Sequence, residues 1–255
     1  MSTTALTSEV ANAAISAFTA PAYSEPARLR TQLAALQRMT TFPLDEDLAV
    51  WAETLVEPDG AFPLLGTGAW ADTFPALLWC GARLARAGAG TDVAALLTGL
   101  AAGSQVHSSA EDFDRAVHGA EAASRVLVAH AHPSPTIARP TTAVLTAAAG
   151  AALLTGVSAD ELVHVLDTAA SLMVLTPGAE IDDAAALSPL WIGHACAAGW
   201  LASALPGLGI TDMPGALANT LDVAAGSSPL DTPWHALLDK PLAQVQVRQV
   251  MEGLA

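Results

Sequence analysis

Apolar residues recur every three or four positions along almost the whole chain. This is the spacing of one face of an α-helix, whereas the alternating β-branched and aromatic runs that are typical of strands are few. Breaks in the pattern fall at proline and glycine, which commonly end helices. The pattern predicts about ten helices, over residues 5–19, 26–40, 45–56, 75–88, 91–106, 111–131, 139–155, 159–173, 189–204 and 214–224.

Helix-end signals support two of these boundaries. Ser158 precedes an apolar helical pattern and Glu161 follows it three positions later, which predicts a capping box. Gly156 is expected to end the preceding helix. The last stretch, residues 239–255, mixes strand and helix spacing, and both alternatives stay open there.

Composition narrows the fold class. The chain has 255 residues, of which 52% are hydrophobic, and its mean hydropathy is +0.43. These values suggest a membrane protein, but there is no uninterrupted apolar run of about 20 residues, the length that spans a bilayer. Because alanine and glycine let helices approach closely, we expect an all-α, compact multi-helix bundle over residues 1–255 as one domain. The N-terminus lacks the basic start and apolar core of a secretory signal, so a cytoplasmic protein is expected.

Net charge and cysteine spacing argue against nucleic-acid, membrane and metal binding. The net charge is −15 with only ten basic residues, which disfavours nucleic acid and anionic membrane surfaces as partners. The simplest account of the acidity is a solvated shell around an alanine-rich protein. Cys80 and Cys196 lack metal-ligand spacing and are expected to be buried free thiols.

Four stretches, in order, resemble one family. They are "LLGTGAWADT" (64–73), the helix pair from Pro75 through "ARAGAGTDVAALLTGLAAG", "AHPSPTIARPTTAVLTAAAGAALLTGVSADEL" (131–162) and "SPLWIGHACAAGWLASALPGLGITDMPGALA" (188–218). Together they resemble the helical domain of the MmgE/PrpD family, which includes 2-methylcitrate dehydratase and cis-aconitate decarboxylase, over about residues 60–220. The resemblance implies a homodimer and a helical domain without the family's lid, residues 222–255 being a candidate lid remnant.

The same resemblance implies a set of site residues. His132 matches a family histidine, and Asp72 and Thr73 match the end of a family acidic stretch, next to Trp70. Ser188 and Trp191 stand where the family has a lysine and a histidine. Since the cation is replaced, the implied substrate is a small molecule less anionic than a tricarboxylate.

Roles for these residues follow from their chemistry, each with a plainer alternative. His132, at a proline-rich turn, is the candidate for proton transfer, with Asp72 as its partner and Thr73 orienting a substrate oxygen. The alternative is that Asp72 and Thr73 only cap the helix that follows. The loop acids Glu180 and Asp183 are candidate general acids or ordinary solvated side chains.

The helix from residue 189 carries further substrate-binding candidates. Trp191 and His194 lie three residues apart and share a helix face, so both are expected to line a pocket together with Ser188 and Trp70. Core packing of Trp191 and a purely structural His194 are the alternatives. His130 and His132 form a His-x-His pair without a clear third ligand, so no metal site is expected.

The resemblance, together with these residues, implies a small-molecule lyase, isomerase or cyclase of a biosynthetic pathway that uses acid–base chemistry and needs neither cofactor nor metal. The second hypothesis is a non-catalytic binding or scaffold protein that retains the family fold.

Overall fold

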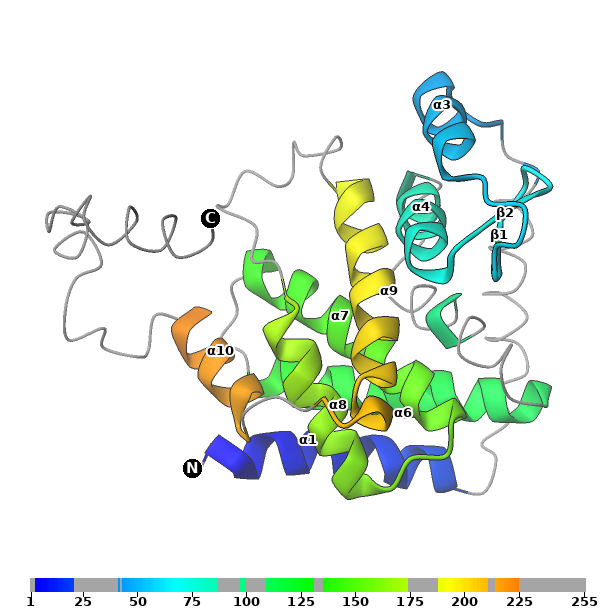
Figure 1. The fold of residues 1–255 in the computed structure, drawn as a ribbon. Helices are drawn as coiled ribbons and strands as arrows, with labels where there is room; N and C mark the ends of the chain where they lie inside the picture. Colours follow the sequence, from blue (N-terminus) through cyan, green and yellow to red (C-terminus); the bar gives the residue numbers. More distant parts are fainter. Residues whose placement is uncertain are drawn as a thin grey trace, which may run out of the picture.

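The computed structural model describes residues 3–20, 41, 43–86, 97–99, 109–130, 135–173, 188–210 and 214–224. Figure 1 shows the fold, and its elements are α1 (Thr3–Thr19), α3 (Glu46–Leu55), β1 (Phe62–Leu64), β2 (Ala69–Ala71), α4 (Thr73–Arg86), α6 (Ala110–His130), α7 (Pro135–Leu154), α8 (Ala159–Ser171), α9 (Ser188–Ala204), the short 3₁₀ helix η2 (Pro206–Leu208) and α10 (Ala216–Ala224). Of the described residues, 77% are helical and 4% are in strands, which confirms the predicted all-α class.

Helix α9 is the central element of the described fold. It packs against α4 on one side and against α7 on the other, with further contacts to α8 and η2 (Figure 1). Helices α1 and α6 pack together, and α7 lies on α6. Because α9 has neighbours on several sides, it needs an apolar surface all round rather than a single apolar stripe.

Two glycines allow α4 and α9 to approach this closely. A Cβ atom on Gly81 would lie 2.7 Å from the Cα atom of Gly193, and one on Gly193 would lie 2.1 Å from the carbonyl oxygen of Leu78. Any side chain at either position would therefore force the two helices apart.

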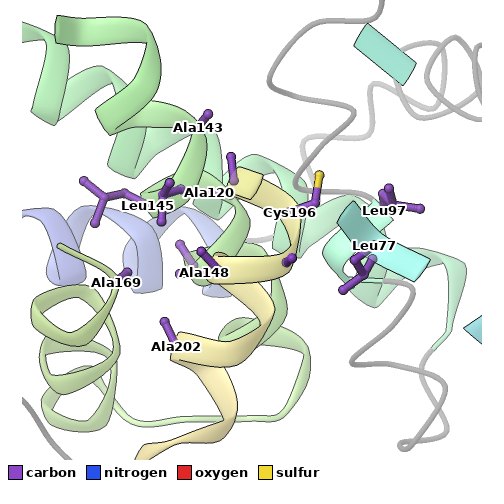
Figure 2. Close-up of a cluster of buried hydrophobic side chains, with 14 of the residues drawn as sticks. Leu77, Leu97, Ala120, Ala143, Leu145, Ala148, Ala169, Cys196 and Ala202 are labelled. Carbon is purple, nitrogen blue, oxygen red and sulfur yellow. The ribbon is translucent and has the colours of Figure 1, made fainter. Parts of the chain in front are cut away.

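Small side chains also dominate the core, where a cluster of buried residues draws on α1, α3, the hairpin, α4 and α6 to α10. Figure 2 shows Ala120, Ala148, Ala169 and Ala202, which come from four helices of this cluster, together with the larger Leu145, Leu77 and Leu97. The predicted close packing of alanine-rich helices is therefore present.

The sequence analysis missed a short hairpin. Strands β1 and β2 pair in antiparallel register, with Pro63 opposite Trp70. The turn between them contains Gly66 and Gly68, both with positive φ, 85° and 77°. Because each strand has only three residues, its apolar alternation is too short to stand out against the helical spacing around it.

Both predicted helix ends are confirmed. Ser158 Oγ accepts a hydrogen bond from the Glu161 N–H, and the Glu161 carboxylate accepts one from the Ser158 N–H, so α8 begins with a capping box. Gly156, with φ 77°, follows the end of α7. Helix α7 begins at Pro135 rather than at 139, since proline is tolerated in the first turn of a helix, where its missing N–H has no intrahelical partner.

Some predicted elements fall outside the described residues. These are the helix at 26–40, most of the one at 91–106, the ambiguous stretch at 239–255 and nearly all of the candidate lid remnant at 222–255. None of the helices in the described ranges is both long enough and apolar enough to span a bilayer.

Candidate functional site

His194 is the best-defined of the predicted site residues. It lies in the first half of α9 and is half-buried. Its Nε2 atom is 3.0 Å from the carbonyl oxygen of Leu172, the C-cap residue that follows α8. The last carbonyls of a helix lack intrahelical partners, so this hydrogen bond satisfies one of them and fixes the orientation of the imidazole ring.

Trp191 lies three residues before His194, and both side chains are half-buried. The Trp191 side chain packs against the edge of the hydrophobic core. Both residues therefore have structural contacts, His194 with the Leu172 carbonyl oxygen and Trp191 with the core, while part of each residue stays accessible. Ser188 is the first residue of α9, and its side chain lies outside the described part of the structure.

Asp72, Thr73 and Trp70 lie together at the junction of the hairpin and α4. The Asp72 carbonyl oxygen accepts the hydrogen bond of the Ala76 N–H at 3.0 Å, so Asp72 occupies the N-cap position by its backbone. Its side chain is exposed, Thr73 is half-buried, and Trp70 is 49% exposed on the outer side of β2.

The site residues of α9, Trp191 and His194, are not linked directly to those at the hairpin, Trp70, Asp72 and Thr73. Among the described residues, no hydrogen bond or ion pair joins Asp72 or Thr73 to His194. His132, Glu180 and Asp183 lie outside the described residues. The predicted pairing of His132 with Asp72 therefore stays a prediction.

Neither cysteine forms a disulfide and both are buried, as predicted. Burial raises the pKa of Cys80 to about 12 and that of Cys196 to about 12. Both are therefore protonated thiols at neutral pH, which excludes them as nucleophiles there because the thiolate is the reactive form. The Cys80 Sγ atom contacts the Pro63 carbonyl oxygen at 3.6 Å and so helps hold the hairpin against α4.

Arg83 is also buried at this junction. Its guanidinium donates to the Leu65 carbonyl oxygen and stacks over Trp79 at 5.5 Å from the ring centroid. The contact with Trp79 lies within α4, whereas the hydrogen bond to Leu65 ties α4 to the hairpin, so Arg83 helps to pack the hairpin.

Asp167 is a polar residue that the sequence analysis missed. It is 1% exposed, and its carboxylate accepts hydrogen bonds from Thr7 Oγ1 at 3.0 Å, the Gly215 N–H at 2.8 Å and the Leu217 N–H at 3.1 Å. The last two donors lie at the beginning of α10, so the carboxylate joins α1, α8 and α10. The available signal was an acid in the second half of a helix, where the helix dipole disfavours a negative charge unless other donors compensate.

A metal centre finds no support within the described ranges, where no three histidine, cysteine or acidic side chains gather closely enough to hold an ion. Comparison with known proteins adds no relative, since no family model, no curated protein and no solved structure matches the chain.

Proposed function

We propose that this protein is a small-molecule lyase, isomerase or cyclase that works by acid–base chemistry without a metal or an organic cofactor. The observation that carries the proposal is the oriented, half-buried imidazole of His194. The reaction class comes from the resemblance of residues 60–220 to the MmgE/PrpD helical domain, and that relationship is part of the proposal.

The hydrogen bond to Leu172 decides which nitrogen of His194 carries a proton. A carbonyl oxygen only accepts, so Nε2 must be the N–H donor. In the neutral ring, Nδ1 then holds the lone pair, and the described residues supply no hydrogen bond to it. An imidazole held by one nitrogen with a lone pair on the other is the arrangement that a general base requires.

Trp191 bears on the kind of substrate. It lies on the same side of α9 as His194, where a half-buried indole offers an apolar wall to a ligand. With serine at the position of the family's lysine, this wall favours a substrate less anionic than a tricarboxylate. His132, Glu180 and Asp183 remain the candidates for the second proton-transfer group.

His194→Gln tests the base. The amide nitrogen of glutamine can still donate to the Leu172 carbonyl oxygen, so the fold is kept while the titratable lone pair is lost. The assay incubates the protein in D₂O with a panel of mono- and dicarboxylic acids and their hydroxy and unsaturated derivatives, and follows C–H exchange and conversion by ¹H NMR. We expect wild-type protein to turn over at least one panel member and His194→Gln to be slower by a factor of about 100 or more.

His118→Gln is the matched control, because His118 is an exposed histidine on α6. It should retain wild-type exchange. Undiminished exchange in His194→Gln would show that another group is the base.

The second candidate function is a binding or scaffold protein. It is favoured by the exposed aromatic side chains at the hairpin, Trp70 at 49% and Phe74 at 38%. Metabolite profiling of a deletion strain separates the two candidates. An accumulating small-molecule precursor supports the enzyme, whereas an unchanged metabolite profile with the loss of a protein complex supports the scaffold.

A further inference from the structure

One end of the fold carries an exposed surface around Trp70 and Asp72, which no hydrogen bond or ion pair of the described residues joins to His194. We call it the Trp70 face, and it consists of the exposed apolar side chains Val56, Trp70 and Phe74 with the exposed carboxylates Glu53, Glu57, Asp59 and Asp72. It lies on α3, the hairpin and the beginning of α4, at the end of the molecule opposite α10 (Figure 1).

A backbone contact brings two segments of this face side by side. The Glu57 N–H donates to the Trp70 carbonyl oxygen at 2.8 Å, so the segment that follows α3 runs alongside β2. Trp70 and Asp72 alternate with the buried Ala71 along the strand and so point to its outer side. Phe74 follows in the first turn of α4 and is 38% exposed.

The apolar side chains are about half exposed, with Val56 at 47% and Trp70 at 49%. The backbone of Trp70 is already fixed in a paired strand, so its exposed side chain loses little conformational freedom when a partner covers it. Tryptophan is also among the residues that contribute most to the free energy of binding at interfaces. Neighbouring apolar side chains enlarge the area that such contact removes from water.

Charge identifies the partner. Residues 43–86 contain seven carboxylates and two arginines. One arginine, Arg83, is buried, and the other, Arg86, is ion-paired with Asp45. The part of the surface that residues 43–86 form therefore carries a net negative charge and complements lysine or arginine, whose cations also interact favourably with an indole ring.

We propose that the Trp70 face docks a basic segment with apolar side chains, contributed by another protein. The apolar residues of that segment would cover Val56, Trp70 and Phe74, while its cations would meet the surrounding carboxylates. This inference rests on the second candidate function, the binding or scaffold protein, and does not use the small-molecule chemistry proposed for His194.

The test measures binding of a fluorescein-labelled, 15-residue helical peptide of lysine and leucine to the full chain by fluorescence anisotropy. Two further peptides replace every lysine by glutamine or every leucine by serine. We expect the lysine–leucine peptide to bind, both altered peptides to bind at least tenfold more weakly, and added salt to weaken the binding.

Variants locate the binding. Trp70→Ala should weaken it at least tenfold, whereas Leu208→Ala, which truncates a 73% exposed leucine on η2, should leave it unchanged. Glu57→Gln with Asp59→Asn should weaken it severalfold. Its control is Glu9→Gln with Asp160→Asn, two exposed carboxylates on α1 and α8.

Three outcomes would overturn the proposal. Equal binding to Trp70→Ala would mean that the peptide follows the general acidity of the protein. Equal binding of the serine peptide would mean that the apolar side chains play no part. If light scattering showed that Trp70→Ala abolishes self-association, the face would belong to an interface with a second copy of this chain.

Discussion

Gly193 shows how one residue limits the distance between two helices. Its missing side chain leaves room for the Leu78 carbonyl oxygen and for the Ala82 nitrogen, which would lie 2.1 and 3.1 Å from a Cβ atom. Both are backbone atoms of α4 and cannot move without moving the helix. Glycine in a helix is otherwise unfavourable, so close packing must compensate for its low helix propensity here.

Gly193→Ala should therefore destabilise the protein even though alanine is the better helix former. We expect a decrease of about 2 to 3 kcal/mol in the free energy of unfolding, because overpacking outweighs the roughly 1 kcal/mol gained in propensity. Urea denaturation followed by circular dichroism measures it. Gly207→Ala, where no atom lies within 4 Å of an added Cβ, should change stability by less than about 0.5 kcal/mol. Equal stabilities of the two variants would contradict a tight α4–α9 contact.

His194 is the residue where sequence and structure bear on each other most directly. The sequence could show that it shares a helix face with Trp191, since three-residue spacing fixes that. Its hydrogen bond to Leu172 joins residues 22 positions apart and depends on how α8 and α9 pack. Local spacing does not contain that information, so the assignment of Nδ1 as the candidate base required the tertiary structure.

At the scale of elements, α8 makes polar contacts at its beginning and in its second half. Its beginning is local, because the capping box joins Ser158 and Glu161, three residues apart. Its second half depends on distant partners, since Asp167 accepts from Thr7 and from the first residues around α10. The first feature was predicted and the second was missed.

The capping box gives a pH dependence with a definite sign. Hydrogen bonds from the Ser158 backbone and hydroxyl lower the pKa of Glu161 from its usual 4.5. A carboxyl whose pKa is lower in the folded state stabilises the protein above its unfolded pKa and loses that contribution as the pH falls through the folded value. Glu161→Gln should therefore lower the melting temperature at pH 7, and the difference from wild type should shrink towards about pH 3. A difference that stays constant across this range would contradict the linkage, and thermal melts at several pH values measure it.

Asp167→Asn probes the link between α1, α8 and α10. Whichever way the amide is turned, its NH₂ group faces a backbone N–H, either that of Gly215 or that of Leu217. We expect a loss of about 2 to 4 kcal/mol in the free energy of unfolding, because a buried donor is left without a partner.

The control for this substitution is Asp160→Asn, an exposed acid in the first turn of the same helix, which should cost about 0.5 kcal/mol or less. Amide hydrogen exchange at Gly215 and Leu217 should accelerate in Asp167→Asn alone. Unchanged exchange there would mean that α10 docks without the carboxylate.

At the scale of the whole molecule, small residues and net charge act together. Alanine and glycine let the helices pack closely around α9, while the charge of −15 keeps copies of so apolar a chain apart. Association of two copies must then use a specific interface rather than non-specific hydrophobic contact.

Homodimerisation is the expectation that belongs to this scale. Light scattering should give about 52 kDa, twice the chain mass of 25.8 kDa. A mass near 26 kDa across the accessible concentration range would reject the dimer. Raising the salt concentration should strengthen association, because it screens the repulsion between two acidic chains.

The sequence by itself determined the all-α class, most helix positions in the described ranges, the capping box and the burial of both cysteines. These properties depend on periodicity and on contacts between near neighbours, which the order of residues contains. Only the tertiary structure decided the hairpin at Trp70, the approach of Gly81 to Gly193, the donors to Asp167 and the partner of His194. The strands of the hairpin are too short to give a clear alternation. The other three features depend on packing between segments distant in sequence, and the free energy of that packing is shared among many residues rather than encoded in a local pattern.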